Sequence, residues 1–497
     1  MDKTKLALRE MRSLAQTMPQ NEGAPLTVER TIGHSADRNG RYCRVVDSLT
    51  VFDEPIDFRG LCTRVIDAKT DYLVLDLDRT THLDRNLGEL LGWEIEAYRA
   101  YGMDRLNELD ANRVLERLFL DRRTPLRTLS YLLNGVASWA YPGLTYLIGV
   151  KLASRSPRLE RWTYRQFGPE AVTILQRCIQ TAMLHKIAGL NRQDLYHLAE
   201  RVWNRVSADQ VIEREDIAWL RSRFPRLRTI ITSASPQPML EFARNALGVD
   251  GVLYSSATET EDSFQAPFHV NRRYRTGPLD QISTPENVSI NSGRQKIERL
   301  IQQYPDFGKP GCNVVGISDT RHGEDHCWAQ FFTRVVDVNS NAPYVPIVAH
   351  DSPLRDVYSA RLLSRSQRQG DHSIQRLVGP TRRIEGDALR TKLAPHVNQI
   401  EAHAREYDRV RSATSDGLDA LERAGLTAVK DIANAVENFN VASASTRNKD
   451  LQTLRSRLRD EARLRRAYAK MHRPLSMHQY AIVEELRAAR TRIDEST

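Results

Sequence analysis

The chain has 497 residues, of which 40% are hydrophobic and 27% are charged. This composition is ordinary for a folded protein of two to three domains, and it excludes a chain that is disordered throughout. The net charge of +9 fits an anionic substrate, a nucleic acid or an acidic membrane surface equally well, so it excludes none of them. The five cysteines are odd in number and form no CxxC pair, which predicts free thiols in a reducing cytosol.

Residues 1–70 are predicted to form an N-terminal extension. The first 20 residues are charged throughout and lack the apolar run of a secretory signal, so we expect a cytoplasmic protein. Their apolar side chains are spaced as in a short amphipathic helix. Residues 44–52 contain a short strand-like run.

A buried parallel strand is predicted at residues 72–75, because this short apolar run ends in two acids, Asp76 and Asp78. Three later segments show the pattern of buried strands: 227–236, 252–256 and 312–319. Helical segments separate them, and residues 328–339 are predicted to form a helix that leads to a fifth strand. The alternation predicts an α/β fold with a doubly wound parallel sheet. Its core is formed by two segments, 71–82 and 227–350.

A block of helical pattern, residues 83–226, interrupts the α/β core directly after the first strand. Within it, residues 128–150 form a run of 23 residues without a charge, long enough to span a bilayer. An asparagine, glycines and hydroxyl side chains dilute its apolar character, and basic residues flank both ends. We predict a buried helical hairpin that turns at Pro142-Gly143, with its apolar side packed on other helices. The alternative is contact with a membrane or a hydrophobic substrate tunnel.

The C-terminal region, residues 371–497, is rich in arginine, alanine and leucine and has almost no strand signal. Four helices are predicted there: 387–411, 416–438, 447–471 and 477–492. Residues 455–473 are densely basic, a pattern that can bind nucleic acid or anionic lipid. We interpret it as a solvated face, we do not expect nucleic-acid binding, and we expect the helices to self-associate, to bind a protein partner or to dock on the core.

Polar side chains follow three of the predicted strands, at the edge where an open parallel sheet binds ligands. Asp76 and Asp78 follow the first strand, Thr232 and Ser233 the second, and Asp319 the fourth. Of two carboxylates placed two residues apart, one can attack phosphorus while the other donates a proton to the leaving oxygen. Such a pair is costly unless a cation shares it, and Mg²⁺ prefers oxygen ligands of this kind.

These segments resemble four motifs of the haloacid dehalogenase (HAD) superfamily of phosphatases, closest to its phosphoserine-phosphatase-like branch. The first motif is LVLDLDRT, with Asp76, Asp78 and Thr80, and the second is ITSASP. The third is GRQKIERL, with Lys296 opening a helix, and the fourth is VVGISDTRHGED. The resemblance covers residues 71–85 and 227–340. It implies a Rossmann-like HAD core in which the helical insertion is a cap that selects the substrate.

The resemblance also implies roles for the residues that match. Asp76 is expected to attack phosphorus and form an aspartyl-phosphate, and Asp78 to serve as general acid and base. Ser233 is expected to hydrogen-bond a phosphoryl oxygen, although Thr232 could fill the same position. Lys296 is expected to neutralise charge on the nucleophile and the phosphate. Thr80 is expected at the phosphate as well.

The metal implied by the resemblance is Mg²⁺, held by Asp76, by the backbone carbonyl of Asp78 and by Asp319. The second acid of the last motif is either Glu324 or Asp325, and we favour Asp325 as the further metal-site residue. A zinc site is not expected here, because the nearby histidines and cysteine lack a paired ligand spacing.

The sequence therefore predicts a Mg²⁺-dependent phosphohydrolase acting on a phosphorylated small molecule, most simply a phosphomonoester. Two alternatives stay open. The first is an enzyme for a lipid or isoprenoid phosphate, or a phosphotransferase, at a membrane surface. The second is a binding or scaffold protein that retains the fold and works through its C-terminal helices.

Overall fold

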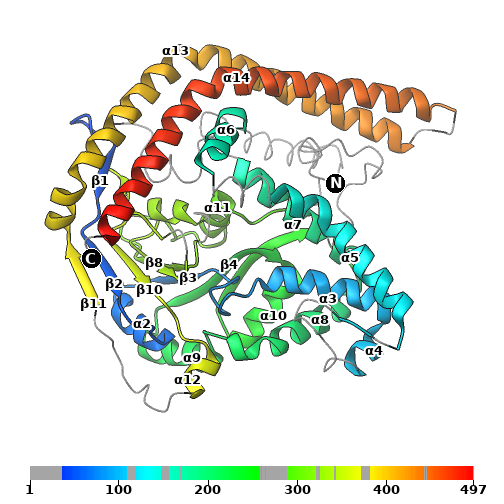
Figure 1. Ribbon diagram of the computed structural model, residues 1–497, viewed down its shortest axis with the longest axis horizontal. Helices are drawn as coiled ribbons and strands as arrows, with labels where there is room; N and C mark the ends of the chain where they lie inside the picture. The colour runs from blue at the N-terminus through cyan, green and yellow to red at the C-terminus, as the bar shows by residue number, and fades with distance from the viewer. Residues whose placement is uncertain are drawn as a thin grey trace.

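The computed structural model shows a mixed α/β chain with two long C-terminal helices (Figure 1). The residues it describes are 36–108, 119–121, 123–146, 156–167, 171–257, 259, 263–264, 288–320, 325–340, 343–370, 381–441, 443 and 445–495. The helix predicted within the first 20 residues lies outside them.

A nine-stranded sheet forms the centre of the described structure. Its strands, in spatial order, are β11 (Thr381–Glu385), β2 (Ser48–Phe52), β10 (Asp356–Ala360), β8 (Arg334–Val338), β7 (Val314–Ser318), β3 (Tyr72–Leu75), β4 (Arg228–Pro236), β5 (Gly251–Ala257) and β6 (Val288–Ser289). The strands from β2 to β5 run parallel, and the edge strands β11 and β6 run antiparallel to their neighbours. The predicted fold class is confirmed.

The sheet extends beyond the core that the sequence predicts. Strand β2 comes from the expected N-terminal extension and pairs with β10 and β11. A separate two-stranded sheet joins β1 (Cys43–Val45) to β9 (Ile347–Ala349). These pairings link segments far apart in the chain, which no local pattern reports. The helix predicted at 328–339 is wrong: a short 3₁₀ helix, η8 (His326–Gln330), is followed by β8.

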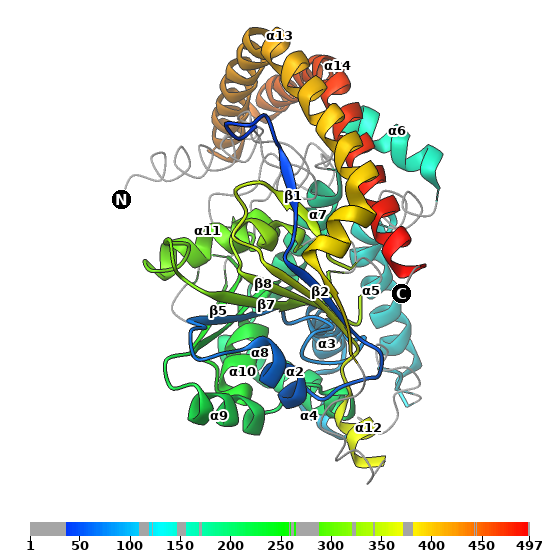
Figure 2. The same cartoon turned by 90° about the vertical axis from the view of Figure 1, so that its left-hand side faces the viewer.

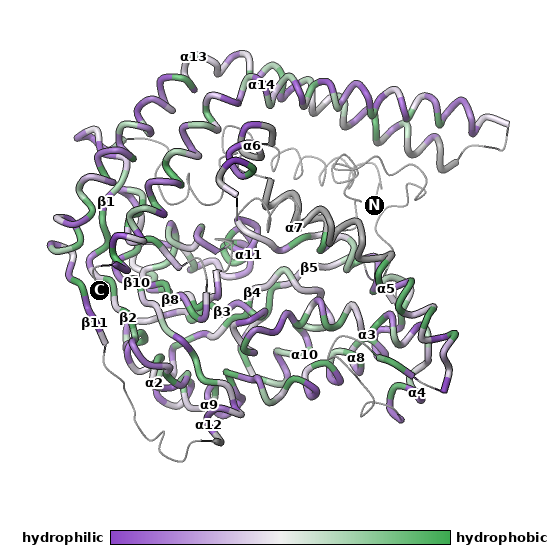
Figure 3. Tube along the Cα trace, in the orientation of Figure 1, coloured by the Kyte–Doolittle hydropathy of each residue, from purple (hydrophilic) through white to green (hydrophobic). Residues whose placement is uncertain are grey.

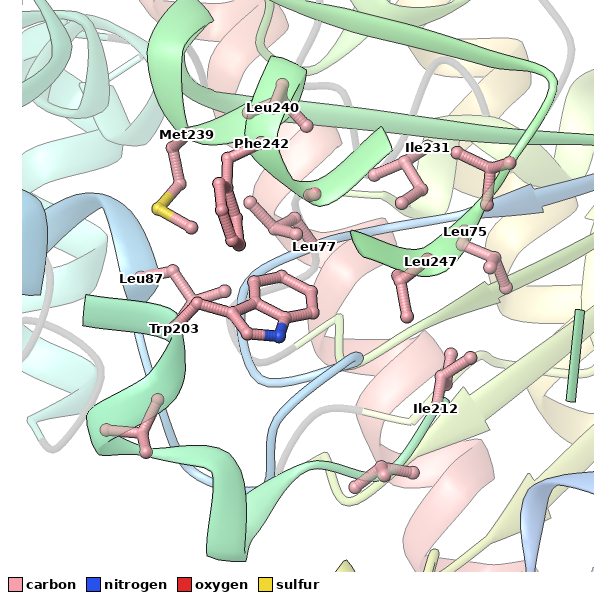
Figure 4. Close-up of a cluster of buried hydrophobic side chains, with 14 of the residues drawn as sticks. Leu75, Leu77, Leu87, Trp203, Ile212, Ile231, Met239, Leu240, Phe242 and Leu247 are labelled. Carbon is pink, nitrogen blue, oxygen red and sulfur yellow. The ribbon is translucent and has the colours of Figure 1, made fainter. Parts of the chain in front are cut away.

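Helices cover both faces of the sheet, as a parallel sheet requires (Figure 2). Side chains alternate along β3, so that Leu73 and Leu75 join one buried cluster and Tyr72 and Val74 the other. The first cluster includes residues of α2 (Phe58–Val65), α3 (Leu87–Tyr101), α8 (Arg192–Arg205), α9 (Arg214–Arg223) and α10 (Gln237–Leu247). Figure 4 shows part of it, around Trp203.

The second cluster contains residues of α11 (Arg294–Gln303) and of both C-terminal helices, α13 (Gly386–Val441) and α14 (Arg447–Asp494). The four helices predicted in this region are therefore two, with Pro395 and Pro474 inside them. The start of α13 and the end of α14 form part of the protein core. The end of α13 and the start of α14 project from the core as a hairpin (Figure 1). A short helix, α12 (Arg365–Gly370), precedes β11.

The cap is the helical insertion between β3 and β4. Besides α3, α8 and α9 it contains α4 (Met103–Glu108), α5 (Pro125–Tyr146), α6 (Pro157–Phe167), α7 (Ala171–Ile187) and η5 (Ser207–Asp209). The predicted turn at Pro142-Gly143 is wrong, because α5 continues through both residues. The predicted packing of its apolar side is wrong for Leu129, Leu133 and Val136, which are exposed. A proline inside a helix removes one hydrogen bond and can bend the helix without ending it. No helix in the described part of the chain combines the length and the apolar character needed to cross a bilayer.

Candidate active site

The first two acids of the site lie where β3 ends. Asp76 continues the strand by one residue, and its backbone N–H donates to the carbonyl of Ile317 on β7 at 3.0 Å. The side chain of Asp76 is largely buried. Arg79 has a φ of 60°, a left-handed conformation that turns the chain directly after Asp78. Both carboxylates are thereby placed at the C-terminal edge of the sheet.

Lys296 reaches this edge from α11. Gly293 precedes the helix with a φ of 54°, which a residue with a side chain would adopt only with strain. The buried Lys296 Nζ donates to Asp76 Oδ1 at 3.0 Å and to both carboxylate oxygens of Asp325, at 2.9 and 3.2 Å. The same ammonium lies 5.6 Å from the centre of the Trp328 ring. The structure therefore brings together the predicted nucleophile, the predicted lysine and the favoured second acid.

Burial sets the protonation behaviour of this group. It raises the pKa of Asp76 to about 7; Lys296 opposes the rise, and the carboxylates of Asp325 and Asp78 add to it. Burial alone would lower the pKa of Lys296, but the carboxylates of Asp325 and Asp76 raise it above its ordinary value. Lys296 is consequently cationic at neutral pH. The single ammonium of Lys296 faces two buried carboxylates, those of Asp76 and Asp325. A further positive charge beside Asp76 would therefore favour the ionised form of Asp76.

Asp78 is held from two sides. Its Oδ1 accepts from the backbone N–H groups of Leu87, at 2.7 Å, and Gly88, at 3.3 Å, in the first turn of α3. Its Oδ2 accepts from Ser235 Oγ at 2.6 Å and from Ser233 Oγ at 3.3 Å. A helix N-terminus favours a negative charge through its unpaired N–H groups and its dipole. The first cap helix and the end of β4 therefore fix this carboxylate jointly.

Sequence reasoning missed Ser235. The segment SASP contains two serines, and the motif alone favours the first of them, Ser233. In the structure, Ser235 makes the shorter hydrogen bond to Asp78, and its backbone N–H donates to Ser233 Oγ at 3.1 Å. Gly88 lies so close that an added Cβ would collide with Ser235 Oγ. Only the approach of α3, which is not visible in the local sequence, identifies this residue.

Thr232 is turned toward a different partner. Its Oγ1 accepts from Asn291 Nδ2 at 3.1 Å, and the same amide donates to the carbonyl of Ser233 at 2.9 Å. Ser233, in contrast, directs its hydroxyl to Asp78. Of the two residues that the sequence left open for the second motif, the structure places Ser233 beside Asp78, the predicted general acid/base, and Thr232 beside Asn291.

Asp319 and Asp325 follow β7 in the chain, whereas Thr80 lies in the loop after β3. Asp325 Oδ2 accepts from Ser318 Oγ at 2.5 Å, and the backbone carbonyl of Asp325 accepts from Tyr344 OH at 3.0 Å. Asp319 follows β7 directly and is buried. Thr80 is also buried, and its Oγ1 has no hydrogen-bond partner among the described residues. Glu324 lies outside the described residues.

The donor set for a metal is made of oxygen atoms. The carboxylates of Asp76 and Asp319, with the backbone carbonyl of Asp78, offer the ligand type that Mg²⁺ prefers. Asp78 is predicted at the metal through its backbone carbonyl, and its side chain bonds to the start of α3. The side chain of Asp325, the favoured further metal-site residue, bonds to Lys296. In the part of the chain that the structure describes, no three acidic, histidine or cysteine side chains gather as a metal site. The agreement with Mg²⁺ therefore concerns the type of ligand, which is two carboxylates and one carbonyl.

Comparison with known proteins gives only distant likenesses. No protein-family model matches the chain, and no curated protein matches its sequence. Among solved structures, a protein of unknown function from Bordetella pertussis Tohama I is similar with a TM-score of 0.32 and 11% identity, over 55% of this chain and 92% of that one. A probable phosphoserine phosphatase from Vibrio cholerae is similar with a TM-score of 0.27 and 12% identity, over 56% of this chain and 58% of that one.

A phospho-aspartyl intermediate analogue of phosphoserine phosphatase is also similar, with a TM-score of 0.27 and 10% identity, over 55% of this chain and 87% of that one. At such values the likeness says nothing about the activity or substrate of this chain.

Proposed function

We propose that the chain is a Mg²⁺-dependent phosphohydrolase that works through an aspartyl-phosphate on Asp76. The observation that carries the proposal is the contact of the buried Asp76 with Lys296, beside the clamped carboxylate of Asp78. A structural ion pair would need no second carboxylate fixed at the same sheet edge. A phosphoryl-transfer site needs a nucleophile, a proton donor and positive charge together.

The chemistry divides between the two acids. Lys296 holds Asp76 Oδ1, and Oδ2 is the oxygen that would attack phosphorus. As the new O–P bond forms, the bond to the substrate alcohol breaks, and Asp78 gives its proton to the leaving oxygen. Asp78 then takes a proton from a water molecule, which attacks the aspartyl-phosphate and releases inorganic phosphate and the free carboxylate of Asp76.

The cation and the hydroxyl groups serve the transferring group. Lys296 would balance charge on the phosphoryl oxygens, and the hydroxyl of Ser233, which lies 3.3 Å from Asp78 Oδ2, would donate to one of them. Asp76 and Asp319, with the carbonyl of Asp78, would hold Mg²⁺, which would polarise the phosphoryl group. The substrate class that we propose is a phosphomonoester, with its alcohol portion selected by the cap.

Turnover by purified protein tests this function. The panel consists of phosphorylated metabolites and p-nitrophenyl phosphate, with Mg²⁺ and with a chelator in its place. We expect activity that needs Mg²⁺ and that Asp76→Asn abolishes. Asp71→Asn is the matched control, because Asp71 precedes the same strand at the opposite edge of the sheet, where its carboxylate accepts from the N–H of Asn313 at 2.8 Å. Full activity of folded Asp76→Asn would overturn the proposal.

A further inference from the structure

One face of helix α5 is apolar and exposed. Leu126, Leu129, Leu133 and Val136 have exposed fractions of 81%, 53%, 61% and 59%. Their spacing of three and four residues places them on the same side of the helix. Figure 3 shows the hydrophobic residues along this part of α5. Single exposed apolar residues are ordinary on a protein surface, but a contiguous apolar row marks a site of interaction with a protein or a membrane. We call these four residues the α5 stripe.

The opposite face of α5 fixes how the helix lies. Tyr131 is fully buried, its ring centre lies 6.0 Å from that of Trp93 on α3, and its hydroxyl accepts from the backbone N–H of Phe119 at 3.2 Å. At Gly135 the helix approaches so closely that a Cβ would collide with the ring of Trp93. The α5 stripe is therefore presented outward by a packed helix, and rotation of the helix to bury it would break these contacts.

The sequence on both sides of the stripe carries charge of one sign. Between Asp121 and Glu160 the sequence contains no acid but contains six basic residues: Arg122, Arg123, Arg127, Lys151, Arg155 and Arg158. Arg123 and Arg127 are exposed in the structure. The nearest acid in the sequence, Asp121, is paired with Arg105 at 2.9 Å, and this hydrogen bond lowers the pKa of Asp121 to about 2.

We propose that the α5 stripe docks the protein on an anionic lipid surface, with α5 lying in the plane of the interface. The apolar side chains would enter the boundary between headgroups and acyl chains, and Arg123 and Arg127 would contact lipid phosphates. An exposed apolar row with basic neighbours is the pattern of helices that lie on a bilayer. The docking that we propose is peripheral.

A second copy of the chain fits the stripe less well. A standard protein interface takes roughly 20–30 residues from each partner, whereas the stripe has four. Two copies that met through α5 would also face each other with arginines and with no acid of this segment to pair them. An anionic membrane supplies both an apolar interior for the stripe and negative charge for the neighbouring arginines.

Flotation of the full-length protein with lipid vesicles tests the proposal without reference to catalysis. One set of vesicles is pure phosphatidylcholine, and the other contains equal parts of phosphatidylcholine and phosphatidylglycerol. We expect flotation with the anionic vesicles, weakened by salt because exposed charges are screened. The double variant Leu129→Ser/Leu133→Ser should lower binding about tenfold or more, because each leucine loses burial in the lipid.

The control is Ile301→Ser, which removes an exposed apolar side chain from α11, outside the stripe. It should float like wild type. All variants are compared by circular dichroism, since the substituted side chains are exposed and their loss should leave the fold intact. Absence of flotation for wild type, or equal flotation of wild type and the double variant, would contradict the proposal. So would a dimer in solution that the double variant converts to a monomer, because the stripe would then be an interface between copies.

Discussion

Lys296 and Asp325 are joined by two hydrogen bonds, at 2.9 and 3.2 Å, while Lys296 holds Asp76 by one, at 3.0 Å. Asp325 is itself fixed by the hydroxyl of Ser318. The ammonium that faces the proposed nucleophile is therefore placed by an acid whose own position is set by β7. This arrangement favours a positioning role for Asp325.

Asp325→Asn should separate positioning from metal binding. The amide keeps the size of the side chain but loses the charge that holds Lys296, and a misplaced catalytic group costs about 100-fold in rate. We expect kcat to fall by this order, with an unchanged Mg²⁺ concentration for half-maximal rate. Asp319→Asn is the matched comparison, and it should raise the Mg²⁺ requirement. If excess Mg²⁺ restores the rate of Asp325→Asn, Asp325 is a metal ligand instead.

Ser235→Ala should weaken the proposed general acid/base, Asp78, without touching the proposed nucleophile, Asp76. The variant removes the 2.6 Å hydrogen bond to Asp78, and loss of a bond to a charged group costs roughly 1.5–3 kcal/mol. We expect kcat about tenfold lower or more and a shifted pH profile. A profile and rate identical to wild type would show that Ser235 does not position Asp78.

Gly88→Ala tests the same contact from the side of α3. Alanine is a better helix former than glycine by about 1 kcal/mol, so the local helix should not suffer. Its methyl group would collide with Ser235 Oγ, and we expect a loss of rate similar to that of Ser235→Ala. In the double variant the collision is relieved, so the two effects should not add. Additive losses would show that the two residues act separately.

Asp337 should make stability depend on pH. Burial raises the pKa of this carboxyl to about 7, although its bond with Thr320 opposes the rise. Because the folded pKa lies above the unfolded value of about 3.9, the stabilising contribution is full below pH 4 and is lost as the pH rises toward and through 7. Asp337→Asn, measured by urea unfolding, should gain up to a few kcal/mol over wild type at pH 8 and about nothing at pH 4. An equal difference at both values would contradict this.

The cap and the C-terminal hairpin are joined by Glu160 on α6 and Arg487 on α14, which form two hydrogen bonds of 2.7 Å each. Arg161 adds a contact with Glu484 at 3.5 Å and lies over the ring of Tyr480. We expect Arg487→Glu to increase hydrogen exchange in α6, by about a factor of five for a loss near 1 kcal/mol. Adding Glu160→Arg should restore protection. Unchanged exchange in the single variant would show that the pair does not hold α6.

The strands β3, β4, β5 and β7 could be predicted because their apolar runs are local and end in polar residues, as at Leu75 and Asp76. The edge strand β11 could not, since its TRRIE sequence alternates between exposed and half-buried positions and becomes a strand only by pairing with β2. The lysine and the paired acids of the site follow from motif order. Ser235 does not, because its role depends on how closely α3 approaches β4.

The central claim is that phosphorus becomes bonded to Asp76. Rapid mixing of protein with an active phosphomonoester and Mg²⁺, followed by acid quench, digestion and mass spectrometry, measures this directly. We predict that the peptide with Asp76 gains the mass of one phosphoryl group during turnover, that fragmentation places it on Asp76, and that Asp76→Asn shows none. Turnover at full rate with no phosphorylated peptide at any time, or with the phosphoryl group on another residue, would contradict the mechanism.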